Sequence, residues 1–205
     1  MTAASAGDET RARIVDAALE TLKEHGIVGT SARAIARTGD FNQALIFYHF
    51  GTVNDVLLAA LDKLTARRLA QYEARLGEVS TLPELVSIAR ELHGEDVREG
   101  HLTVLSQLLA GSFGSPELGA QVWKRFEPWN GVIERAVTRV VAGTPFDGLV
   151  PLGDLAYAIS SAFLGIELLT HLEQNEQREE SLFATLELIA GLVNAILSVT
   201  PNPSA

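Results

Sequence analysis

Apolar residues recur at the spacing of an α-helix along most of the chain, and this period constrains the fold more than any other feature. Between residues 14 and 22 a single helical stripe is formed by Ile14, Val15, Ala18, Leu19 and Leu22. No stretch shows the sustained two-residue alternation with hairpin turns that strands require. The sequence therefore predicts an all-α fold.

Capping residues, glycine and proline divide this pattern into helices. Asp8 or Thr10 can cap the first helix, and Gly26 follows its end. Further helices are expected over residues 30–37, 42–49, 53–76, 82–93, 95–110, 116–141, 153–174 and 180–199. Pro128 predicts a kink or a break within its segment. The two short helices at 30–37 and 42–49, joined by a four-residue turn that contains Gly39, have the outline of a helix-turn-helix motif.

Composition and charge exclude several classes of protein. The 205 residues include no cysteine, which excludes a disulfide scaffold, a thiolate metal site and a cysteine nucleophile. The net charge of -10 excludes a generic nucleic-acid-coating polycation. Residues 1–50 hold 5 basic and 6 acidic residues and residues 51–205 hold 11 and 20, so the acidity lies mainly in the C-terminal part. No signal peptide or bilayer-spanning segment is recognised, so we expect a soluble cytoplasmic protein without a membrane partner.

Enzyme and metal-site motifs are not found in the sequence. It contains no GxSxG, GxGxxG, P-loop or HExxH pattern, so we expect no enzyme, no catalytic residue and no cofactor. One cluster holds residue types that bind metals: His93, Glu95, Asp96 and His101. Its spacing matches no established metal site. We interpret it as a solvated connection between helices.

The N-terminal residues resemble a known family. Thr10–Leu19, Gly26, Thr30–Ala36 and Tyr48–Phe50 are similar, in order and spacing, to the N-terminal signature of TetR-type transcriptional regulators. The similarity extends from residue 8 to about residue 62, and the remaining residues match only in helix count, length and apolarity. It implies a homodimer that binds a palindromic operator in double-stranded DNA, usually as a repressor, and is released by a small-molecule effector.

The same resemblance divides the chain into parts. It implies a flexible N-terminal arm at residues 1–7 and a helix-turn-helix DNA-binding domain at residues 8–52. A helical effector-binding and dimerisation domain is expected at residues 53–200, arranged as antiparallel helices, with a tail at 201–205. The alternative is a helical homodimeric protein-interaction module without specific DNA binding.

The second short helix has the pattern of a base-reading helix. Ile46 and Phe50 are four residues apart and can bury together, which leaves Gln43, Ala44 and Phe47 on a different side. A glutamine can pair with adenine, and small or apolar side chains can touch a thymine methyl group. Gln43 can equally be a solvated helix residue.

Arg33 is the second candidate for base contact, because the family commonly places a DNA-contacting side chain near the start of the preceding helix. Arginine reads guanine or binds phosphate, and the alternative is a surface salt bridge. Tyr48 is a phosphate candidate or a core aromatic residue. The whole expected DNA-binding set is Thr30, Ser31, Arg33, Asn42, Gln43, Ala44, Leu45, Phe47, Tyr48, His49 and Thr52.

Three residues depart from the family pattern. Asp40 stands where the turn glycine is usual, and aspartate tolerates the left-handed conformation better than most residues. Phe47 replaces a common tyrosine, and Val53 replaces a common lysine. Both replacements remove an expected phosphate contact.

Two C-terminal segments are apolar nearly all round, with 11 hydrophobic residues of 15 in 155–169 and 13 of 18 in 182–199. Such helices must bury two faces, and a second copy of the chain is the simplest partner. The alternative is one large buried core. The expected dimer interface comprises Leu155, Ile159, Phe163, Ile166, Leu182, Leu186, Ile189, Val193 and Ile196.

An effector pocket is expected among the middle helices, where aromatic and polar residues occur within apolar runs. Aromatic residues at helical spacing are more often plain core. The candidate pocket residues are Tyr72, His101, Gln107, Trp123, Phe126 and Phe163.

Overall fold

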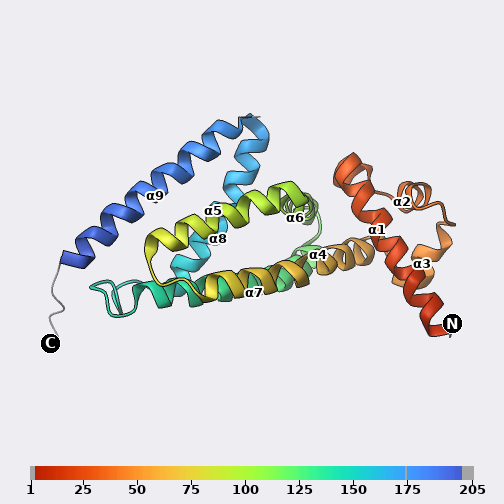
Figure 1. Ribbon diagram of the computed structural model, residues 1–205. Coiled ribbons are helices and arrows are strands. Elements are labelled where there is room, and N and C mark those ends of the chain that lie inside the picture. The colour runs from red at the N-terminus through yellow and green to blue at the C-terminus, as the bar shows by residue number, and fades with distance from the viewer. Residues whose placement is uncertain (1–2, 174, 200–205) are drawn as a thin grey trace. The chain divides into compact units, whose positions relative to one another are not determined.

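Figure 1 shows the computed structural model, which describes residues 3–173 and 175–199. Within these residues the chain forms nine α-helices and no strand, which confirms the predicted all-α class. The helices are α1 (Ala3–Gly29), α2 (Ala32–Thr38), α3 (Ala44–Phe50), α4 (Val53–Gly77), α5 (Leu82–Glu99), α6 (His101–Ser112), α7 (Pro116–Val141), α8 (Leu152–Glu173) and α9 (Glu176–Val199).

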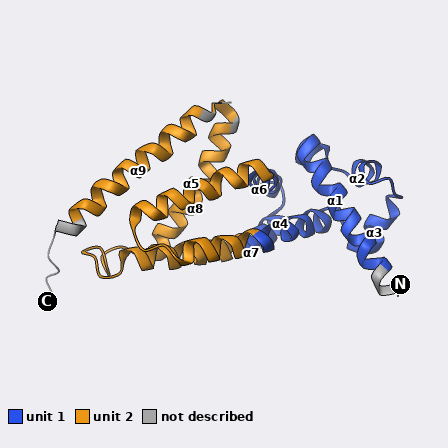
Figure 2. Ribbon diagram, viewed as in Figure 1, with its two compact units in different colours: residues 1–67, 100–125 blue, residues 68–99, 126–205 orange. Residues whose placement is uncertain are grey.

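The helices form two compact units, which are coloured separately in Figure 2. Unit 1 comprises residues 1–67 and 100–125, and unit 2 comprises residues 68–99 and 126–205. The segment expected to be the DNA-binding domain lies wholly within unit 1. That unit also contains α6, which packs on α1.

Unit 1 is built around the apolar stripe predicted for the first helix. Ile14, Ala18 and Leu22 of α1 are fully or almost fully buried. Helices α2, α3, α4 and α6 add further buried residues to the same core, which are Ile35, Ile46, Leu57, Val104 and Leu108. One continuous apolar core therefore fixes the helix-turn-helix segment against α1, α4 and α6.

The start of α1 differs from the expected flexible arm. The helix begins at Ala3, so residues 3–7 belong to it. Alanine has the highest helix propensity, and the Thr10 hydroxyl donates a hydrogen bond to the Ala6 carbonyl. Gly26 interrupts α1 with φ 66°, at the predicted end of the first helix, and a short helical turn follows as far as Gly29.

The prediction of a helix break between His93 and Glu95 is wrong. Helix α5 continues through Gly94 to Glu99, and the break lies at Gly100, where φ is 73°. A glycine inside a helix costs only about 1 kcal/mol relative to alanine, and the burial of His93 and Asp96 on either side favours the helix. A left-handed φ at Gly100 ends it.

Two other helices also differ from their expected bounds. Pro128 lies within α7 without ending it, so the break that was one of two expected outcomes there does not occur. Helix α9 begins at Glu176, one turn before the expected residue 180.

Unit 2 combines a small apolar core with helices whose outer faces are apolar. Its core includes Tyr72, Leu76, Leu92, Val132 and Ala136. Helix α9 packs on α5 and α8. Among the described residues, one helical segment, Leu152–Thr170 of α8, is long and apolar enough to cross a membrane by length and composition alone, and 11% of it is buried.

Candidate nucleic-acid interface

The turn between α2 and α3 packs closely against α1. Ser31 caps α2, because its hydroxyl accepts a hydrogen bond of 3.2 Å from the Ala34 amide. Asp40 adopts φ 50°, which confirms that an aspartate occupies the left-handed position of this turn. A Cβ atom on Gly39 would lie 2.1 Å from the Phe41 ring and 2.8 Å from the Ala17 side chain, so this position has no space for a side chain.

Helix α3 has one buried side and one exposed side. The Asn42 carboxamide accepts a hydrogen bond of 2.9 Å from the Ala44 amide, where the helix begins. Ile46 is fully buried, and Leu45 and Phe50 pack partly against the same core. The expected burial of Ile46 is confirmed, and it directs the opposite side of α3 to solvent.

The exposed side of α3 carries the candidate base-reading residues. Gln43 and Ala44 are exposed at its N-terminal end, and Phe47 is 52% exposed one turn later. Tyr48 is 82% exposed, so it is not a core aromatic residue, and its ring contacts that of His49 edge-on. These residues form a surface with hydrogen-bonding and apolar groups but no acidic side chain.

The phosphate candidates differ in their surroundings. Ser31 is exposed, whereas Thr30 is only 8% exposed and its hydroxyl donates to the Gly26 carbonyl at 2.7 Å. Thr52 caps α4 by accepting a hydrogen bond from the Asp55 amide, and its hydroxyl donates to the Asp55 carboxylate at 2.6 Å. Val53 packs partly against the unit 1 core. The Thr30 hydroxyl is therefore poorly placed to meet a phosphate.

An open hollow of about 580 Å³ lies beside α3, lined by Arg33, Ala36, Arg37, Asp40, Phe41, Asn42 and Gln43. Its two arginines are exposed and lie on the same side of α2, because they are four residues apart. Arg33 was predicted from the sequence as a site residue, and Arg37 was not. The four-residue spacing is the signal that was available.

Two arginines of α1 were also missed as site residues. Arg11 Nη1 donates to the His49 carbonyl oxygen, and Arg13 Nη2 donates to the Gly39 carbonyl oxygen at 3.3 Å. The first bond lies at the C-terminal end of α3, and the second lies in the turn before α3. Both side chains therefore contact the segment that carries the candidate reading residues.

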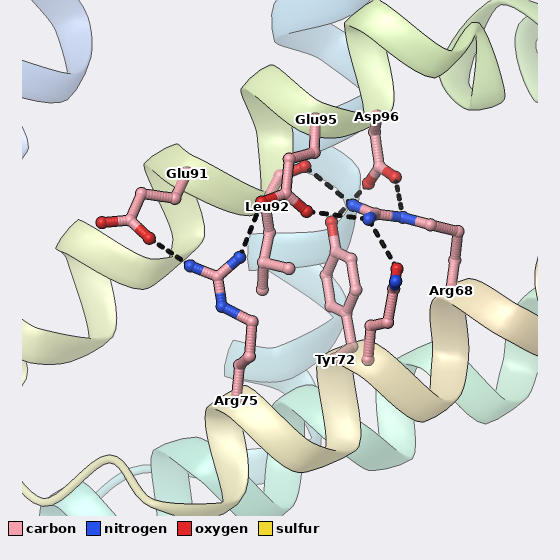
Figure 3. A network of polar contacts seen from close by, with 8 residues as sticks. Arg68, Tyr72, Arg75, Glu91, Leu92, Glu95 and Asp96 are labelled. Carbon is pink, nitrogen blue, oxygen red and sulfur yellow. Dashed lines mark hydrogen bonds and ion pairs between the residues drawn. The ribbon is translucent and has the colours of Figure 1, made fainter.

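Unit 2 contains a buried polar network, shown in Figure 3. Arg68 of α4 is only 1% exposed and pairs with Asp96 of α5, with 2.6 Å between Nε and Oδ1. It also contacts Glu95 at 2.9 Å and donates to the Leu92 carbonyl oxygen at 3.1 Å. The Tyr72 hydroxyl donates to the second Asp96 oxygen at 2.5 Å. The network joins α4 to α5 with charged groups.

The contacts within the network favour the charged forms of Arg68 and Glu95. Burial acts to lower the pKa of Arg68, but the hydrogen bond to Glu95 and the charge of Asp96 outweigh it and raise that pKa. The hydrogen bond from Arg68 lowers the pKa of Glu95. Burial, followed by the charge of Asp96, raises the pKa of the Tyr72 phenol, so this residue remains a neutral donor.

The expectation that His93, Asp96 and His101 belong to a solvated connection is wrong. All three are buried, because α5 continues past Gly94 and carries His93 and Asp96 into the interior. Among the described residues, no group of three or more histidine, aspartate or glutamate side chains is arranged to hold a metal ion.

The structure does not bring the six expected pocket residues together in one unit. Tyr72, Phe126 and Phe163 belong to unit 2, and His101, Gln107 and Trp123 belong to unit 1. Tyr72 is held by Asp96, and the Gln107 carboxamide accepts a hydrogen bond of 3.0 Å from the Ile27 amide. At least these two side chains have structural partners.

The expected interface residues of α9 do lie on one outward side. Leu182, Leu186, Ile189 and Ile196 are exposed and Val193 is partly exposed, whereas Phe183 and Ala190 are buried. On α8, Leu155, Ile159 and Ile166 are partly exposed. Phe163 instead contacts His93 and packs on the unit 2 core.

Comparison with known proteins identifies the N-terminal region. The family model described as "Bacterial regulatory proteins, tetR family" matches residues 14–60. The HTH-type transcriptional repressor Rv3405c of Mycobacterium tuberculosis is 39% identical over 69 residues, which cover 33% of this chain and 37% of that protein. The curated relatives that this chain matches are aligned over less than half of their own length.

Solved structures resemble the chain over most of its length. The fatty acid degradation regulator FadR from Bacillus halodurans superimposes with a TM-score of 0.71 at 15% identity, over 87% of this chain and 96% of that chain. The multidrug binding protein EbrR, solved with malachite green, gives a TM-score of 0.61 at 26% identity, over 88% of this chain and 97% of that chain. Residues 14–60 of the chain therefore match the TetR family of bacterial regulatory proteins, and the chain has the fold of these solved regulators.

Proposed function

We propose that this protein is a cytoplasmic transcriptional repressor that binds a palindromic operator as a homodimer and releases it when a small molecule binds. The observation that carries the DNA-binding part is the two-sided arrangement of α3. Ile46 holds the helix to the core, and Gln43, Ala44 and Phe47 lie exposed on its other side. A recognition helix needs this arrangement in order to reach base edges in the major groove.

We assign different roles to the residues of this surface. Gln43 reads an adenine, while Ala44 and Phe47 contact thymine methyl groups. Arg33 and Arg37 supply the positive charge beside them and bind guanine or phosphate. The sugar-phosphate backbone of the DNA is contacted by Ser31, Asn42, Tyr48 and His49. The half-buried Leu45 and the buried Thr30 contribute mainly to packing.

The homodimer is supported by the outward faces of α8 and α9. Leu182, Leu186 and Ile189 present an apolar row to solvent, although α9 already buries Phe183 and Ala190 against its own unit. An exposed row of this kind marks an interaction site. A second copy placed across a two-fold axis would cover both rows, and a two-fold dimer binds a palindromic site with one half-site for each subunit.

The effector proposal is supported by the interior of unit 2. The buried atoms His93 Nε2 and Asn130 Oδ1 have no hydrogen-bond partner among the described residues. His93 Nδ1 lies 2.9 Å from a Glu179 carboxylate oxygen, and its ring contacts Phe163 and Phe183. The contact with Glu179 occupies Nδ1, so Nε2 is the ring nitrogen left for another partner. The acidity of residues 51–205 disfavours an anionic effector, and EbrR has been solved with malachite green and with proflavin.

Selection of bound duplexes from a random DNA pool tests the proposal. The expected product is an inverted repeat whose half-sites are separated by about one helical turn or a multiple of it. Recovery of the pool without a preferred sequence would contradict specific DNA binding and would favour a protein-interaction module. A panel of organic cations, with proflavin as the first probe, tests the effector proposal by release of the selected duplex.

A further inference from the structure

We propose that Arg11 of α1 is a positioning residue for sequence reading, which holds α3 at the angle that places Gln43 and Ala44 against the bases. This inference rests on the proposed DNA-binding function. Arg11 Nη1 donates to the His49 carbonyl oxygen, and its guanidinium carbon lies 4.2 Å from the centre of the Phe50 ring. Arg11 thus contacts the last turn of α3 through both its polar edge and its flat face.

Helix α3 needs such a contact because it is short. It has seven residues, whereas isolated helices shorter than about 12–15 residues are marginal in water. Ile46 is its one fully buried side chain. One fully buried side chain, with Leu45 and Phe50 only partly buried beside it, fixes the position of the helix better than its rotation. The direction of the reading side therefore also depends on contacts at the ends of α3.

The C-terminal end of α3 is a favourable place for a cation. The last carbonyl groups of a helix have no partner within it and carry partial negative charge. The Gly51 amide bonds to the Phe47 carbonyl at 3.0 Å, while Arg11 bonds to the His49 carbonyl. Arg11 therefore supplies a hydrogen bond to the His49 carbonyl, and its positive charge interacts favourably with the negative end of the helix dipole.

Arg13 makes the corresponding contact at the other end of the segment. Its Nη2 donates to the Gly39 carbonyl oxygen in the turn before α3. Helix α1 thus holds residues 39–50 near both ends, with Ile46 between them. Because α1 also supplies the central stripe of the unit 1 core, these bonds tie the direction of the reading side to the core.

A positioning role predicts different behaviour from a direct phosphate contact. Loss of a phosphate contact weakens binding to every sequence and reduces the salt slope by about 1 per subunit. Loss of a positioning contact affects all the base contacts that depend on α3, while the phosphate contacts remain. Specificity then falls, and the salt slope does not change.

The experiment compares Arg11→Met, Arg11→Gln and Arg11→Lys in the full chain. Arg67→Met is the matched control, because it removes an exposed cation from α4 in the same unit. Fluorescence anisotropy over a salt series gives the affinity of each variant for the selected operator and for a scrambled duplex. Hydrogen exchange of the α3 amides in the free protein provides a second readout.

For Arg11→Met we expect the ratio of operator to scrambled affinity to fall about 10- to 100-fold, the size of one or two lost base contacts, with the salt slope unchanged. Exchange of the α3 amides should accelerate, and that of the α1 amides should not. Arg11→Gln keeps a hydrogen-bond donor, so its ratio of operator to scrambled affinity should fall less than that of Arg11→Met. Arg11→Lys, which keeps the donor and the charge, should restore most of the ratio. Arg67→Met should leave the ratio unchanged.

Equal loss on both duplexes with a slope reduced by about 2 per dimer would overturn the proposal and make Arg11 a phosphate contact. An unchanged ratio in folded Arg11→Met would also overturn it. If Arg11→Met unfolds, the ratio of operator to scrambled affinity is measured for Arg11→Gln instead, and an unchanged ratio there overturns the proposal. If the wild-type protein shows no sequence preference, the proposed function itself fails, and that result is distinct from a failure of the Arg11 proposal.

Discussion

The two units of this protein bury their apolar residues in different ways. In unit 1, α1, α2, α3, α4 and α6 all contribute to one apolar core, and the surface left on α3 is small and mixed. In unit 2, Arg68 and Asp96 form a charged pair in the interior, and apolar rows of α9 face outward. The difference is what the proposed homodimer predicts, because the apolar row of α9 in unit 2 would then be covered by a second copy.

The largest expected effect concerns the outward row of α9. Ile189→Glu should abolish the proposed dimer and, with it, operator binding, because an unpaired charge buried in an interface costs roughly 3–5 kcal/mol per subunit. Sedimentation analysis gives the mass. Ala184→Glu is the matched control, because Ala184 is exposed on the other side of α9 and should leave the dimer intact. A stable wild-type monomer at micromolar concentration would contradict the proposal that a second copy covers the apolar row of α9.

The second prediction tests the charged interior of unit 2. Asp96→Ala leaves Arg68 buried beside one fewer carboxylate and should lower the free energy of unfolding by about 3–5 kcal/mol. Glu91→Ala removes a more exposed partner of Arg75 and should cost about 1 kcal/mol or less. Urea denaturation measures both. Equal losses for the two variants would mean that burial does not distinguish the pairs.

A smaller effect is expected from the close packing of unit 1. Gly39→Ala should cost about 1–3 kcal/mol, because the new methyl group would overlap the Phe41 ring and approach Ala17. Gly77→Ala is the control, since a Cβ atom there meets nothing within 4 Å. Thermal unfolding compares them. If Gly39→Ala is as stable as the wild-type protein, the turn has more freedom than its contacts indicate.

Features that depend on residues close together in the sequence were predicted, whereas contacts between residues far apart in the sequence were not. The α1 stripe, the left-handed Asp40 and the buried Ile46 depend on neighbours in the sequence, and all were predicted. The contacts of Arg11 with His49 and of Arg68 with Asp96 join residues 38 and 28 positions apart, and no local pattern indicated either.

The missed α5 boundary has the same cause. Gly94 and Gly100 are equally plausible ends by composition, and the burial of His93 and Asp96 decides between them. Because the helix was expected to end at His93, the buried residues His93, Asp96 and His101 were predicted to be solvated. Pocket residues chosen by residue type alone were divided between the two units, because side-chain chemistry does not specify which core a residue joins.

Gln43→Ala is the sharpest test of whether the exposed side of α3 reads bases. Gln43 is exposed and is not one of the core residues of unit 1, so stability should not change. Binding to operators varied one base pair at a time should lose about 1–3 kcal/mol of preference at one symmetric pair of positions and nothing elsewhere. Uniform weakening at every position would contradict base reading by this helix.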